Sequence, residues 1–170
     1  MLTSKKREEE LVTDIFLREF NARNGFSYET LVVMSEATRV DTRGISAVPG
    51  ELPLDFQVTY ADNGLPHEGG SVLGRGFRLP GTIVDLTTPY DIAAAVDRKQ
   101  QRYGDAVSSR LILLVWKTRS CLVDPRGTGW NEDKIRFRAC YFVCLPGKGV
   151  ESQVLALKPL RDEEGREYGA

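Results

Sequence analysis

The sequence predicts an α/β fold, in which a mixed β-sheet is flanked by helices. Two segments with helical spacing of apolar residues are separated by short apolar segments of strand length. The second helical segment also stands between two of the predicted strands, which is the kind of connection that a parallel strand pair requires. The 170 residues and a hydrophobic content of 41% suit a single domain, residues 1–170, with an apolar core.

The two helices are predicted from their apolar spacing and their end signals. Residues 5–22 carry apolar side chains at helical spacing, and an Asn-Gly pair follows them. In the second helix Thr88 is the expected N-cap, Pro89 the first helical residue and Gly104 the end. One face of this helix carries four residues spaced by four, three and four: Ile92, Val96, Lys99 and Tyr103.

The strands are predicted from short apolar or alternating segments, and the rest of the chain is expected to be loop. The expected strands cover residues 30–34, 54–60, 81–87, 110–118, 135–145 and 153–157. Loops are expected at residues 39–52, 64–76 and 119–133, and residues 161–170 are expected to be frayed. The strand at 110–118 is apolar along its whole centre, which predicts burial on both faces of the sheet.

Two aspartates interrupt the apolar pattern of the segments at 54–60 and 81–87. We interpret residues 54–88 as a hairpin, which places Asp55 and Asp85 on adjacent strands. Carboxylates on neighbouring strands, about 5 Å apart, can share a hard divalent cation such as Mg²⁺ or Mn²⁺. The alternative is that each aspartate has a separate role, in which it caps a loop or pairs with an arginine at the surface.

Other charged side chains could complete such a site. Glu8 and Glu9 lie in the first turns of the leading helix, and one of them could project from the apolar stripe into a cleft. The alternative is a solvated acidic first turn that favours the helix dipole. The ammonium of Lys99 could lie over the hairpin carboxylates, or its chain could simply extend along the apolar face toward solvent.

The segments together resemble the PD-(D/E)XK superfamily of nucleases, also called restriction-endonuclease-like. The resemblance covers about residues 5–118, which would be the nuclease-like core, with C-terminal strands at 119–160. It is carried by the acidic leading helix and by Pro53-Leu54-Asp55 and Asp85-Leu86-Thr87, which open or occupy successive strands. The helix of residues 92–103 and the apolar strand of residues 111–116 follow in the family's order.

The resemblance implies roles for individual residues. Asp55 and Asp85 would bind Mg²⁺ or Mn²⁺, and Glu8 or Glu9 would supply the additional helix acid. Thr87 stands where the family has the lysine that assists the attacking water, so Lys99 is the candidate for that role. The resemblance implies a core like that of restriction endonucleases and a metal-dependent nuclease acting on nucleic-acid phosphodiesters.

Composition limits the other functions and partners. The net charge of −1 gives no overall signature of a nucleic-acid partner, although a local basic patch stays possible. No segment is long and apolar enough for a membrane span, the N-terminus lacks a signal-peptide core, and the cysteine count of three is odd, so we expect a cytoplasmic protein. His67 is the single histidine and lies in a glycine-rich segment, which disfavours a serine or cysteine hydrolase.

Two functional hypotheses stay open. One is the metal-dependent nuclease, with nucleic acid as its partner. The other is a non-catalytic protein- or nucleic-acid-interaction module on the same scaffold, as a homodimer or as part of a larger protein complex.

Overall fold

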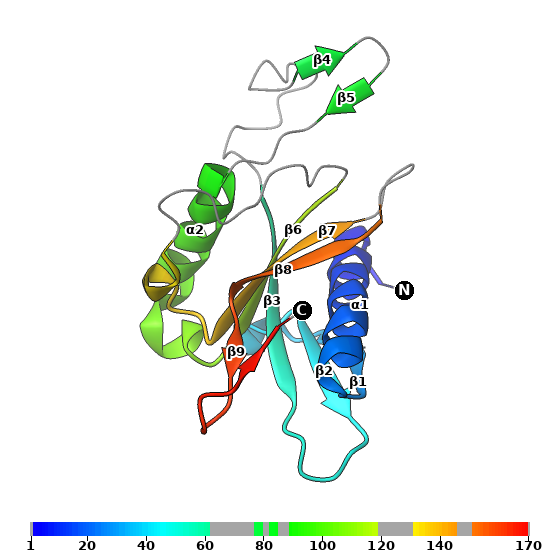
Figure 1. Cartoon of the computed structure of the whole chain (residues 1–170), viewed down its shortest axis with the longest axis vertical. Helices are drawn as coiled ribbons and strands as arrows, with labels where there is room; N and C mark the ends of the chain where they lie inside the picture. The colour runs from blue at the N-terminus through cyan, green and yellow to red at the C-terminus, as the bar shows by residue number, and fades with distance from the viewer. Residues whose placement is uncertain are drawn as a thin grey trace.

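The computed structural model has a six-stranded mixed sheet with a helix on each face (Figure 1). It describes residues 2–61, 77–79, 82–84, 89–118, 131–145 and 151–169. The order in the sheet is β1-β2-β3-β6-β7-β8. These strands are β1 (Tyr28–Val32), β2 (Thr42–Ser46), β3 (Leu54–Tyr60), β6 (Ile112–Thr118), β7 (Ala139–Leu145) and β8 (Gln153–Lys158).

Helix α1 (Ser4–Asn24) covers one face of the sheet. It begins after the N-cap Thr3, whose side chain accepts a hydrogen bond from a backbone N–H, and it ends at Gly25, whose φ is 74°. Its buried stripe includes Phe16, whose ring packs against Phe56 of β3 and Tyr141 of β7. This aromatic contact fixes the helix against the centre of the sheet.

Helix α2 (Pro89–Ser108) covers the opposite face. Ile92 and Val96 pack in one apolar cluster with Leu113 and Val115 of β6 and with Phe142 of β7. The helix connects β3 to β6, which pair in parallel, and β6 also pairs in parallel with β7. The predicted parallel crossover is therefore confirmed.

The sequence-based boundaries need three corrections. Residues 54–60 do not form a hairpin with 81–87, because β3 pairs with β2 and β6, whereas β5 (Thr82–Val84) pairs with β4 (Phe77–Leu79) in a separate two-stranded sheet. The expected loop at 39–52 contains β2. The expected frayed tail forms a hairpin of β9 (Leu160–Arg161) and β10 (Glu167–Tyr168). Gly104, the expected end of the second helix, has a non-helical φ of 70° and separates the first helical segment of α2 from a short second one that runs to Ser108.

The pairing of β2 with β3 stops half-way along β3, and we call the point where it stops the opening between β2 and β3. β2 pairs only with the first half of β3, from Thr42 opposite Phe56 to Gly44 opposite Leu54. The second half of β3 pairs with β6 on its other side. Polar side chains from both helices reach the opening where β2 begins, and these side chains form the candidate site.

Two of the three cysteines lie within the described residues. Cys140 is a free, buried thiol, whereas Cys144 is disulfide-bonded. No helix in the described ranges combines the length and the apolar character that a membrane crossing needs.

Candidate functional site

Asp41 hydrogen-bonds to the backbone of β3 where the pairing of β2 with β3 stops. It immediately precedes β2, and its backbone N–H donates to the carbonyl of Phe56 over 2.9 Å. Its carboxylate oxygen Oδ2 accepts from the backbone N–H of Val58, also over 2.9 Å. The carboxylate is therefore fixed against β3, and only 15% of this side chain is exposed.

Glu9 reaches the same edge from the first turns of α1. The residue is 3% exposed, and its Oε2 lies 2.8 Å from Nζ of Lys6. Neither carboxylate oxygen accepts a hydrogen bond of good geometry, so this contact is an ion pair without a directed bond. Nζ of Lys6 also donates to the backbone carbonyl of Asp41 over 3.4 Å and lies 3.9 Å from its Oδ1. One ammonium thus contacts both acidic residues.

Gln57 of β3 joins this edge to α2. Its Oε1 accepts hydrogen bonds from Nζ of Lys99 at 3.0 Å and from the hydroxyl of Tyr103 at 2.8 Å. Its Nε2 donates to the backbone carbonyl of Arg39. The side chain is almost fully buried, and these bonds satisfy it in one orientation. Gln57 therefore holds the two α2 side chains in place.

The environment of Lys99 changes its protonation. Burial lowers the pKa of its ammonium below the ordinary value, and the carboxylates of Asp41 and Glu9 partly oppose that effect. Burial also raises the pKa of the Tyr103 hydroxyl, and the charge of Asp41 adds to that rise. A buried lysine that loses its proton more easily is typical of sites that transfer protons.

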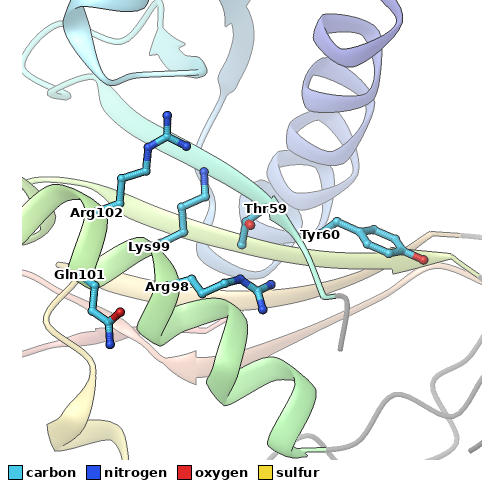
Figure 2. A pocket seen from close by; sticks show the side chains of 6 residues that line it. All are labelled: Thr59, Tyr60, Arg98, Lys99, Gln101 and Arg102. Carbon is cyan, nitrogen blue, oxygen red and sulfur yellow. The ribbon is translucent and has the colours of Figure 1, made fainter. Parts of the chain in front are cut away.

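A basic pocket adjoins the site on the α2 side (Figure 2). It has a volume of about 520 Å³ and is lined by Thr59, Tyr60, Arg98, Lys99, Gln101 and Arg102. In Figure 2 the side chains of Lys99 and Arg102 extend from the helix to the same side, and that of Arg98 extends toward Thr59. Lys99 thus belongs both to the pocket wall and to the hydrogen-bonded group around Gln57.

The oxygen ligands at this edge suit a hard cation. Glu9 and Asp41 supply carboxylates that already share one positive group, the ammonium of Lys6. Mg²⁺ commonly takes one or two carboxylates from the protein and completes its shell with water and substrate oxygens. Within the described ranges no three His, Cys, Asp or Glu side chains are grouped to hold a metal. The protein would therefore contribute two carboxylates, and because both oxygens of Glu9 are buried, an ion bound there would have to take the place of the Lys6 ammonium.

The site residues expected from the sequence do not lie together in the structure. Asp55 is paired with Arg43 of β2, whose Nε lies 2.5 Å from Oδ1 and whose NH2 lies 3.1 Å from Oδ2. Because both of its oxygens accept from one guanidinium, we leave Asp55 out of the candidate site. Glu8 is exposed, whereas its neighbour Glu9 is buried at the opening.

Asp85 and Thr87 lie outside the described residues. The expected hairpin that would have placed Asp55 and Asp85 on adjacent strands is wrong for the described part of the second segment, because β3 and β5 belong to different sheets. Of the other expected residues, Glu9 is paired with Lys6, which also contacts Asp41, and Lys99 is bonded to Gln57 of β3.

Four residues at the site were missed by the sequence analysis: Lys6, Asp41, Gln57 and Tyr103. Asp41 was assigned to a loop, since the strand that follows it lacks an apolar pattern. Gln57 had a usable signal, because an amide in the middle of the segment Leu54–Tyr60 needs buried partners. Tyr103 was expected on the face of α2 that carries Lys99, one turn away, but no partner could be assigned to its hydroxyl.

Comparisons of the chain with protein-family models, with curated proteins and with solved structures find no significant match.

Proposed function

We propose that the chain is a nuclease-like domain that hydrolyses nucleic-acid phosphodiesters with a divalent cation held by Glu9 and Asp41. The observation that carries the proposal is the convergence of these two carboxylates on one ammonium, next to a buried lysine of lowered pKa. Five strands lie between α1 and α2, and the three of them that belong to the six-stranded sheet, β1, β2 and β3, give an order of α1, three sheet strands, α2 and β6 that supports the resemblance to the PD-(D/E)XK superfamily. In this proposal the metal-binding acids are Glu9 and Asp41, whereas the sequence led us to expect Asp55 and Asp85.

Each residue has a defined task in the proposed reaction. Glu9 and Asp41 would hold Mg²⁺ or Mn²⁺, which, when bound, lowers the pKa of a coordinated water and stabilises charge on a phosphoryl oxygen. Lys99, in its neutral form, accepts a proton from the attacking water at Nζ, and its lowered pKa makes that form accessible. Gln57 orients Lys99 through the 3.0 Å hydrogen bond.

Lys6 has a different role, because its ammonium lies where it contacts both carboxylates. It neutralises the acidic pair when no other cation is present, which reduces the cost of burying Glu9. A divalent ion at the pair would replace this ammonium, and the long side chain of Lys6 allows it to move toward solvent.

The test is cleavage of a labelled oligonucleotide with Mg²⁺ or Mn²⁺ by the intact chain and by isosteric variants. We expect Asp41→Asn and Glu9→Gln to lose at least about 100-fold in rate, the scale of one removed charged catalytic group. The Asp41→Asn variant should keep its fold, because its amide oxygen can still accept from the N–H of Val58. Asp55→Asn is the matched control and should cleave normally. Equal rates in all three variants would refute the proposed site.

The second candidate is the non-catalytic interaction module. It is favoured by the ion pairing of Lys6 with both acidic residues and of Lys5 with Glu9 over 3.5 Å, since these two ammonium groups balance the two carboxylates without any metal. In that case neither Mg²⁺ nor Mn²⁺ would change the melting temperature. A rise in melting temperature with Mn²⁺ that disappears in Asp41→Asn would exclude this candidate.

A further inference from the structure

We propose that the edge strand β1 pairs antiparallel with β1 of a second copy of this chain, in a twofold-symmetric dimer that has Leu31 at its axis. The dimer does not depend on the proposed function, because β1 contributes no residue to the candidate site. Three features of this edge support it, namely the direction of its backbone groups, the apolar side chains beside it and its regular register.

The backbone groups of β1 alternate between β2 and the outer edge of the sheet. β1 lies at one end of the six-stranded sheet, with β2 on one side and no described strand on the other. The N–H of Val33 donates to the carbonyl of Asp41 over 3.1 Å, in register with the pairing of β1 and β2. Thr30 and Val32 therefore direct their N–H and C=O groups outward. Such an edge offers hydrogen bonds to another strand.

The side chain of Asn21 occupies this edge at one residue. The N–H of Tyr28 donates to Oδ1 of Asn21 over 3.1 Å, and the carbonyl of Tyr28 accepts from Nδ2 of Asn21 over 2.8 Å. The carboxamide thus bonds as the backbone of a neighbouring strand would, which confirms the outward direction of the groups. It reaches Tyr28 alone, and the groups of Thr30 and Val32 are left for a strand.

The sheet face beside this edge is apolar and exposed. Leu31 is opposite Arg43 of β2, so Leu31 lies on the same face as Ile45, two residues further along β2. They are the exposed large hydrophobic residues of the described strands. α2 packs on this face over β6 and β7, toward the other end of the sheet (Figure 1). An exposed apolar edge strand is typical of a surface that pairs with another chain.

A second copy fits both the backbone and the side chains. When the two Leu31 residues lie opposite each other, Thr30 of each copy forms a hydrogen-bonded pair with Val32 of the other, which gives four backbone hydrogen bonds. The two Leu31 side chains then meet, and Ile45 of each copy extends this apolar row. The net charge of −1 leaves little repulsion between the copies.

The other edge of the sheet is less suited to pairing. β8 pairs with β7 through a register shift at Cys140 and Tyr141, and it ends with Lys158. Bulges and lysines are features that keep edge strands from pairing. β1 pairs regularly over all five of its residues and contains neither lysine nor proline. We therefore expect β1 to pair with β1, which closes a dimer, and not with β8, which would give an open chain of copies.

The first experiment is oxidative cross-linking of the full chain with one added cysteine. Leu31→Cys places two thiols opposite each other at the axis, where Cα atoms of a non-hydrogen-bonded pair are about 4.5 Å apart, within reach of a disulfide. Glu29→Cys is the matched control on the same exposed face, because its two thiols would be four residues apart, roughly 13 Å. We expect a covalent dimer from Leu31→Cys, and none from Glu29→Cys or from the intact chain.

The second experiment is sedimentation velocity without cross-linking. One pair of short strands is a small interface, so we expect a reversible dimer that forms between about 5 and about 500 µM. Leu31→Lys brings two ammonium groups together at the axis and should raise the Kd of the dimer at least about tenfold. Leu11→Lys is the matched control, because Leu11 is 48% exposed and Leu31 49%, but Leu11 belongs to α1.

Four outcomes would overturn the proposal. They are an intact chain that stays monomeric over this range, cross-linking of Glu29→Cys as fast as that of Leu31→Cys, equal association of Leu31→Lys and Leu11→Lys, and growth beyond a dimer, which would indicate pairing of β1 with β8. Neither experiment uses nucleic acid or metal, so a failure of the dimer is distinguishable from a failure of the proposed function.

Discussion

Nζ of Lys99 donates a hydrogen bond to Oε1 of Gln57 over 3.0 Å, and this bond joins α2 to the central strand β3. The same oxygen accepts from Tyr103, and the amide nitrogen of Gln57 donates to the backbone carbonyl of Arg39. One buried amide therefore fixes a lysine, a tyrosine and the segment that leads to Asp41. Its removal should affect stability as well as the position of Lys99.

Gln57→Met should destabilise the protein strongly. The variant keeps the volume but leaves the ammonium of Lys99 and the hydroxyl of Tyr103 without their shared acceptor. We expect the free energy of unfolding to fall by about 2–4 kcal/mol, measured by urea denaturation. Tyr103→Phe is the control, because it removes one of these bonds and should cost about 1 kcal/mol. Equal losses in both variants would show that Gln57 does not organise the group.

Lys6→Met should lower the stability of the metal-free protein and should increase the stabilisation that Mn²⁺ gives. Without metal, the buried Glu9 loses its 2.8 Å ion partner, and the free energy of unfolding should fall by about 3 kcal/mol. With Mn²⁺, the rise in melting temperature should exceed that of the intact chain, because the ion need not replace an ammonium. Lys5→Met is the control, since Lys5 is 79% exposed and should contribute little. A smaller Mn²⁺-induced rise in melting temperature in Lys6→Met than in the intact chain would contradict the idea that the ion takes the place of the Lys6 ammonium.

Asp55→Asn should leave catalysis intact and change stability only slightly. The Arg43–Asp55 pair is partly exposed, with 38% and 30% of the two side chains accessible, so solvent weakens it. We expect the free energy of unfolding to fall by about 1 kcal/mol or less in urea denaturation. Loss of metal-dependent cleavage in Asp55→Asn would show that Asp55 belongs to the catalytic site and would contradict our assignment.

Lys99 should make stability depend on pH in the alkaline range. Its native pKa is lowered, so between that value and 10.5, the ordinary value, the unfolded chain binds more protons than the folded protein. The free energy of unfolding of the intact chain should therefore rise with pH across this window. Lys99→Met should lack that rise, which urea denaturation at several pH values would measure. Parallel pH curves for the two proteins would contradict the lowered pKa.

The sequence predicts those parts of the fold whose signal is local. Residues 5–22 and 110–118 carry strong apolar patterns, and both segments are found as α1 and β6. β2 was missed because its buried positions are Thr42 and Gly44, which have no apolar pattern. Gly44 lies so close to Phe56 that an added Cβ would be 3.3 Å from that ring, so this strand packs through its backbone.

The remaining errors have a common physical cause, namely contacts between residues distant in the chain. The C-terminal hairpin is held by Tyr141, whose hydroxyl donates to the carbonyl of Tyr168 and accepts from the N–H of Leu160. The acidic pair likewise joins α1 to the start of β2 through Lys6. Asp55 and Asp41 are both aspartates near strand starts, but Asp55 is paired with Arg43, whereas Asp41 accepts from the N–H of Val58 and lies near Lys6.

The most direct test of the central claim is titration of Mn²⁺ into the intact chain, Asp41→Asn and Asp55→Asn by isothermal calorimetry. The account predicts one binding event in the intact chain and in Asp55→Asn, and at least about tenfold weaker binding in Asp41→Asn, because one of two carboxylate ligands is lost. Binding that is unchanged in Asp41→Asn, or lost in Asp55→Asn, would contradict the assignment of the metal to Glu9 and Asp41.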